Sequence, residues 1–143
     1  MFIKQLGIAC ALTMSLMAQE RFKVELTSAQ QFVSLHKEVT LLTSYPDNYI
    51  VIEKDSKQGL AKVNPKTLEA QVIVPMAYEE VNFWGGDWAK VKNKGKWGVY
   101  DFKLKKTVFE CKYDDINGFS AQNTAFLLGD KWGLLNDKTG KEI

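Results

Sequence analysis

A short motif that recurs at a near-constant interval constrains this chain more than any other feature. The motif is a lysine, one variable residue and a glycine, found at Lys57-Gln58-Gly59, Lys96-Trp97-Gly98 and Lys131-Trp132-Gly133. The glycines lie 39 and 35 residues apart, and Tyr78 and Tyr113, each followed by two acidic residues, also lie 35 residues apart. Two markers with similar intervals indicate repeated units, and such units must stack because one alone cannot bury its apolar face.

An apolar stretch that alternates with polar residues precedes each motif. The residues predicted to face inward are Ile50 and Ile52, Ala89 and Val91, and Ala125 and Leu127. A period of two is typical of a half-buried strand. Turn-forming residues follow each stretch, so each unit is predicted to be an antiparallel hairpin with a third short strand. The motif glycine is expected where another backbone or an aromatic ring approaches closely.

Several stretches carry a resemblance to a known family. They are NKGKWGVYD with CKYDDI, GDKWGLLNDKTGKEI, and more distantly KQGLAKVN with VPMAYEEV. These stretches resemble the bacterial WG-repeat family over about residues 48–143, which implies an all-β repeat array without known catalytic residues. Gln58 departs from the pattern, where tryptophan is expected. Trp97 and Trp132 are predicted to be core residues that span neighbouring repeats.

Residues 1–18 are predicted to be a secretory signal peptide. Lys4 precedes 13 uncharged residues from Leu6 to Ala18, the pattern of a basic region followed by an apolar region. A membrane-spanning helix needs about 20 apolar residues, so no membrane span is expected. The mature chain is therefore expected in the periplasm or outside the cell, and Cys10 lies too early in the apolar stretch for a lipoprotein anchor.

The segment between the signal peptide and the repeats, residues 19–47, is expected to cap the repeat domain at 48–143. Apolar residues at helical spacing predict a short helix over residues 27–39. Alternatively, residues 39–52 align by the repeat period with residues 78–91, which indicates a degenerate repeat. Either structure would cover an end of the array that otherwise exposes a strand edge or an apolar face.

The composition gives little support to an enzyme, a metal centre or a nucleic-acid binder. The chain has two cysteines, one histidine and a formal net charge of +2. No nucleophile motif lies near His36, and Cys111 is expected to be a buried residue on the strand face of Phe109 and Tyr113. A net charge this small creates no strong attraction for polyanions. We therefore predict no catalytic residue, metal site, cofactor or nucleic-acid partner.

Two acidic pairs, Glu79-Glu80 and Asp114-Asp115, follow the repeated tyrosines. Adjacent residues of a strand point to opposite faces, which does not suit a general acid and base acting on one substrate. We expect these carboxylates to cap turns or loops.

One stretch, FWGGDW at residues 83–88, indicates a binding site. Trp84 lies beside two glycines, and Trp88 begins a strand in phase with Lys90 and Lys92, so we expect these side chains on the solvent face. Two exposed indoles near lysines would form a stacking platform for a sugar or a peptide. The alternative is that a neighbouring repeat or the N-terminal segment covers both indoles.

Taken as a whole, the sequence predicts an exported, all-β WG-repeat protein of the bacterial envelope that acts as a non-catalytic binding or interaction module. The expected partner is a protein or a glycan or peptide of the cell envelope. An alternative is an inhibitor or immunity-type protein that occludes a partner enzyme.

Overall fold

The computed structural model of this protein describes residues 21–120 and 122–143, so the expected signal peptide and Cys10 lie outside the described residues. Thirteen strands occur in this part of the chain. They are β1 (Arg21–Leu26), β2 (Phe32–Ser34), β3 (Thr40–Tyr45), β4 (Tyr49–Lys54), β5 (Lys57–Asn64), β6 (Glu69–Tyr78), β7 (Glu80–Gly85), β8 (Trp88–Asn93), β9 (Lys96–Asp101), β10 (Lys106–Tyr113), β11 (Asp115–Ser120), β12 (Asn123–Leu128) and β13 (Lys131–Asn136). A short 3₁₀ turn, Pro46–Asn48, joins β3 to β4.

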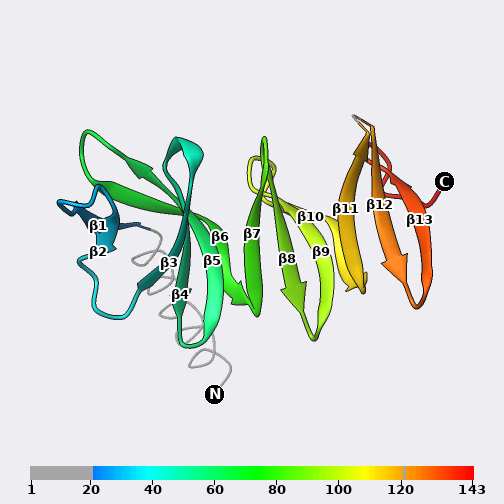
Figure 1. Cartoon of the computed structure of the whole chain (residues 1–143), viewed down its shortest axis with the longest axis horizontal. Helices are drawn as coiled ribbons and strands as arrows, with labels where there is room; N and C mark the ends of the chain where they lie inside the picture. The colour runs from blue at the N-terminus through cyan, green and yellow to red at the C-terminus, as the bar shows by residue number, and fades with distance from the viewer. Residues whose placement is uncertain (1–20, 121) are drawn as a thin grey trace, which may run out of the picture.

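These strands form three antiparallel sheets that follow one another along the long axis of the molecule (Figure 1). The first sheet has the order β2-β1-β6-β5-β4-β3, the second β10-β9-β8-β7 and the third β11-β12-β13. Most neighbours are consecutive hairpin strands, because tight turns with positive φ occur at Asp55, Lys94 and Gly129. The structure thus confirms the prediction of an all-β array of antiparallel hairpins.

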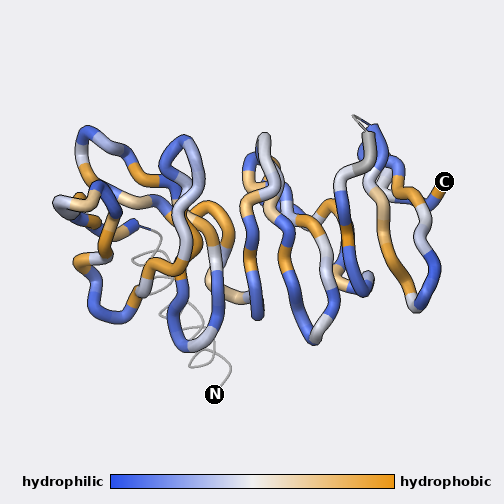
Figure 2. Tube along the Cα trace, in the orientation of Figure 1, coloured by the Kyte–Doolittle hydropathy of each residue, from blue (hydrophilic) through white to orange (hydrophobic). Residues whose placement is uncertain are grey.

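Apolar side chains fill the spaces between successive sheets. The first core lies on one face of the first sheet and contains Phe22, Val24, Val39, Ile50, Ile52, Ala61, Val63 and Ala70. The second, between the first and second sheets, contains Val51, Leu60, Val74, Val81, Ala89 and Val91. The third, between the second and third sheets, contains Val99, Phe109, Tyr113, Ile116, Phe126 and Leu135. Figure 2 shows apolar stretches along the strands and hydrophilic residues at many strand ends.

The inward face of β12 differs from the prediction. Thr124 and Phe126 are buried, whereas Ala125 and Leu127 are half-buried on the opposite face. Phe126 lies opposite Gly133 in the ladder, and the missing side chain of that glycine leaves room for the phenyl ring. In β12, Ala125 and Leu127 are apolar on one face and Phe126 and Leu128 on the other. The alternation of this strand therefore did not show which face lies inward.

The predicted helix over residues 27–39 is wrong. These residues form a turn, the short strand β2 and a second turn. The Oγ atom of Ser34 accepts a hydrogen bond from the backbone N–H of His36 at 3.0 Å, and Gln30 has a φ of 58°. Hydroxyl-to-backbone bonds of this kind favour turns over helices.

The alternative of a degenerate repeat agrees with the N-terminal structure. Strand β4 lies 39 residues before β8, and β3 pairs with β4 as β7 pairs with β8. Strands β1 and β2 then extend the first sheet beyond β6. The sheet curls so that its edge strands β2 and β3 come close to each other, and both contribute side chains to the first core.

Candidate functional site

The glycines of the repeated motif lie where two strands approach closely. A Cβ atom on Gly59 would lie 2.4 Å from the carbonyl oxygen of Val74, and one on Gly98 would lie 2.4 Å from that of Phe109. On Gly133 a Cβ atom would instead lie 2.5 Å from the ring of Phe126. The close approach predicted for these glycines is confirmed.

The two motif tryptophans have different surroundings. Trp97 is half-buried beside the third core, with the Nζ atoms of Lys90 and Lys92 lying 4.6 and 5.4 Å from its ring centroid. Trp132 is 54% exposed, so its predicted role as a core residue is wrong. It belongs to the third sheet, and no further sheet among the described residues covers its face.

The repeated tyrosines pack between sheets. Tyr113 is buried in the third core, with its ring centroid 4.9 Å from that of Phe126. Tyr78 is half-buried against the second core and lies 6.5 Å from Tyr100 between ring centroids. Burial raises the pKa of Tyr78, with smaller contributions from Cys111 and Tyr100, so its hydroxyl stays protonated at neutral pH.

Trp84 and Trp88, the expected stacking platform, stack on each other. Their ring centroids lie 6.3 Å apart with an interplanar angle of 15°, and both indoles pack against the third core. Trp88 also contacts Phe109 edge-on and donates a hydrogen bond from Nε1 to Oδ2 of Asp101 at 3.2 Å. The expected solvent exposure of Trp88 is wrong, because the third sheet lies over the face of β8 that carries it.

The same face of β8 carries the two candidate lysines. Lys90 is only 13% exposed at its side chain, and its Nζ donates to Oδ1 of Asp115 at 2.8 Å. This hydrogen bond lowers the pKa of Asp115. Lys92 is half-buried and lies over Trp97. Both ammonium groups therefore have partners inside the stack, and a ligand-binding role for Trp84, Trp88, Lys90 and Lys92 stays a prediction.

The first acidic residue after each repeated tyrosine caps a hairpin turn, whereas Asp115, the second residue of its pair, bonds to Lys90. Glu79 Oε1 accepts the backbone N–H of Gly95 at 3.0 Å, and Asp114 Oδ2 accepts that of Gly129 at 2.7 Å. Asp114 also pairs with the Nζ of Lys96, which lowers the pKa of the carboxyl, as does the Gly129 N–H. The turn-capping role predicted for these carboxylates is confirmed at equivalent positions of two repeats.

Other reactive side chains do not form a cluster. Cys111 is half-buried against the second core, not on the face of Phe109 and Tyr113, because the register between β9 and β10 shifts within this stretch. Its Sγ lies 3.6 Å from the carbonyl oxygen of Val91, and burial raises the pKa of the thiol. Within the described residues, no group of three or more His, Cys, Asp or Glu is arranged to hold a metal ion.

One face of the third sheet carries apolar side chains that no other sheet of the described residues covers. We call it the end face; it comprises Ala125, Leu127, Trp132, Leu134 and Ile143. Ala125 pairs with Leu134, and Leu127 with Trp132, so these four side chains share one face. The sequence pattern did not predict this surface, because Trp132 was expected in the core.

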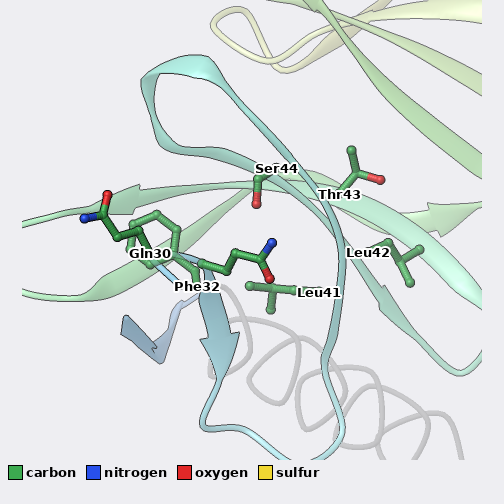
Figure 3. A pocket seen from close by; sticks show the side chains of 7 residues that line it. Gln30, Phe32, Leu41, Leu42, Thr43 and Ser44 are labelled. Atoms are coloured by element: carbon green, nitrogen blue, oxygen red, sulfur yellow. The ribbon is translucent and has the colours of Figure 1, made fainter. Parts of the chain in front are cut away.

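Two shallow pockets occur in the first sheet. One is lined by residues of the turn between β2 and β3, Leu35, His36, Lys37 and Glu38. The other has a volume of about 350 Å³ and is shown in Figure 3. It lies between β2 and β3 and is lined by Gln30, Gln31, Phe32, Leu41, Leu42, Thr43 and Ser44.

Sheets that repeat the same turn caps and glycine contacts define this molecule as a stacked β-repeat protein. Comparison with family models makes the class specific: the WG containing repeat matches residues 69–97 and 103–132. The chain is a WG-repeat protein. Comparisons with curated proteins and with solved structures find no match. No helix among residues 21–120 and 122–143 has the length and apolar character needed to cross a membrane.

Proposed function

We propose that this WG-repeat protein is an exported, non-catalytic interaction module that docks a partner protein on its end face. The exposure of Trp132 carries the proposal. At the equivalent place in the preceding repeat, Trp97 and Val99 are covered by the third sheet. Exposed apolar patches that carry a large aromatic residue are typical of protein interfaces.

The covered interface indicates what chemistry the partner needs. The third sheet covers the second with the apolar side chains of Ile116, Phe126 and Leu135. A partner protein is therefore expected to present a similarly flat, apolar surface. The apolar side chains of Ala125, Leu127 and Leu134 beside Trp132 also favour a protein over a glycan at this site.

The end face differs from the covered interface in one respect. Lys90 and Lys92, which place ammonium groups over Trp97, correspond by the repeat interval to Ala125 and Leu127. The face of the Trp132 indole thus lacks the two cations that its counterpart has. A partner lysine or arginine can supply this cation, an interaction of about 0.5–2 kcal/mol.

Site-specific photo-cross-linking in cells tests the docking surface. A photoreactive amino acid replaces Trp132 in one variant and Leu104, a 60% exposed residue between β9 and β10, in the control. We expect one discrete adduct with another protein from position 132 and none from position 104. Equal adducts from both positions, or no adduct from position 132, would contradict the proposal. If the adduct is an enzyme that loses activity on binding, the inhibitor alternative is supported.

Export is supported by the sequence pattern of residues 1–18. Intact-mass measurement of the protein from a periplasmic or secreted fraction tests it directly. The expected mature chain begins at Gln19. A chain from that fraction that retains Met1 would refute the cleaved signal peptide.

A further inference from the structure

The edge strands of the first sheet differ in charge from the other edge strands. Strands β7, β10, β11 and β13 lie at sheet edges and each contains at least one charged residue. Strands β2 and β3, with the sequences FVS and TLLTSY, contain none. Charged side chains on edge strands prevent pairing with other chains. Both unprotected edges of the described structure therefore belong to one sheet, where they face each other.

The geometry of these two edges leaves room beside β3. A turn at residues 35–39 joins β2 to β3, and the pocket of about 350 Å³ lies between the two strands (Figure 3). The residues that line this pocket are uncharged. Among the described residues, β3 pairs only with β4. The backbone N–H and C=O groups on its other edge thus have no strand partner.

The side chains of β3 present two different surfaces. Leu41 and Ser44 point toward the side of Phe32, whereas Leu42 and Thr43 point away from it (Figure 3). A register shift between Leu41 and Thr43 makes Leu42 a bulged residue, and its side chain is 45% exposed. Phe32 and Leu41 pack against the first core, so the inner surface of the pocket is apolar.

We propose that the outer edge of β3 binds an extended, uncharged peptide segment of a partner as an additional β-strand. Main-chain hydrogen bonds to β3 supply the affinity, as in other cases of strand addition. Four residues, Leu41 to Ser44, line the pocket, which corresponds to a paired length of about 13 Å. Alternate peptide side chains then lie against Phe32 and Leu41, where an apolar residue is favoured.

Because the residues that line the pocket are uncharged, the pocket favours a peptide without charged side chains. A charged side chain on its inner face would lose water without gaining an ionic partner, which is unfavourable. The first sheet would gain a seventh strand along the free edge of β3. This site is separate from the end face, which lies on the third sheet.

The probe is a blocked hexapeptide of alternating valine and threonine, titrated into the protein as purified from cells and followed by amide NMR. We expect saturable shifts of amides in β2 and β3 and slower hydrogen exchange at the outward amides of β3. The control peptide has the same sequence with every second amide N-methylated, which removes backbone donors and keeps the side chains. It should not bind.

Two matched variants localise the site. Leu42→Lys places a charge on the β3 edge, and Leu104→Lys makes the same change at an exposed turn. We expect at least about tenfold weaker binding to the first variant and unchanged binding to the second. The proposal is overturned by shifts that map elsewhere, by equal binding of the N-methylated peptide, or by no shifts up to about 1 mM peptide. Protection of the outward β3 amides before peptide is added would also overturn it, since the edge would already be occupied.

Discussion

Replacing Gly98 by alanine gives the sharpest test of how the repeats are held together. The new Cβ atom would lie 2.4 Å from the oxygen of Phe109 and 2.8 Å from the nitrogen of Cys111, against ordinary contacts of 3.4–4 Å. Strand β10 must therefore move by about 1 Å, at an overpacking cost of about 1–3 kcal/mol. The loss of one or two backbone hydrogen bonds adds about 1 kcal/mol each.

Part of this cost is offset because alanine restricts the unfolded chain, a gain of about 0.4–1 kcal/mol. The net loss in the free energy of unfolding is then about 2–4 kcal/mol, or a decrease in Tm of about 8–15 °C. Guanidinium unfolding followed by circular dichroism and tryptophan fluorescence measures it. Two probes are needed because repeat proteins can unfold in parts.

The matched control is Gly118→Ala in β11. A Cβ atom on Gly118 meets no atom within 4 Å, and Gly118 has no positive φ. We expect this variant to be as stable as the parent or slightly more stable, by up to about 1 kcal/mol. Equal destabilisation by both substitutions would refute the idea that a close backbone approach selects glycine in the motif.

Two further predictions concern side chains between sheets. Trp97→Ala should lower the free energy of unfolding by about 2–4 kcal/mol, because the indole packs against the third core. Trp132→Ala should lower it by less than about 1 kcal/mol, because this indole is exposed. Similar losses for both variants in denaturant melts would contradict this assignment. The lowered pKa of Asp115 means that its pairing with Lys90 stabilises the fold above the ordinary carboxyl pKa, and this contribution is lost as the pH falls through the lowered value. Asp115→Asn should therefore cost up to about 1 kcal/mol at pH 7 and progressively less as the pH falls below the ordinary carboxyl pKa, and a pH-independent difference would refute the linkage.

The repeat interval and the alternation of apolar residues predicted much of the fold. They identified the hairpins, the turn-capping role of Glu79 and Asp114, and the close contacts at Gly59 and Gly98. These features depend on neighbours within one repeat or at its junction with the next. Local sequence is therefore enough to specify them.

The faces of the strands were harder to predict. Alternation shows which side chains share a face, but it does not show whether another sheet covers that face. Trp88 and Lys90 alternate with buried residues and so have the pattern of a solvent face, yet the third sheet covers them. In a stack, an inner sheet has two covered faces, and a lysine on such a face is accommodated by an ion pair such as that with Asp115.

The N-terminal segment shows a second limit of sequence patterns. Apolar residues from Phe32 to Val39 have helical spacing, but the strand β2 and its turns are formed instead. Phe32 and Val39 contribute to the first core from both sides of a turn. Tertiary packing therefore outweighs the weak helical preference of this stretch.

The two ends of the described array differ in how their apolar faces are covered. The first sheet curls over its own outer core and adds β1 and β2 to do so. The third sheet has only three strands, and its next pairing is a single bridge between Leu135 and Glu142. Gly59 and Gly98 each meet the backbone of a fourth strand, whereas Gly133 meets only a phenyl ring. Within residues 21–120 and 122–143, the third sheet has one strand fewer than the second and no sheet over its outer face, so a docked protein can cover the indole of Trp132 as the third sheet partly covers that of Trp97.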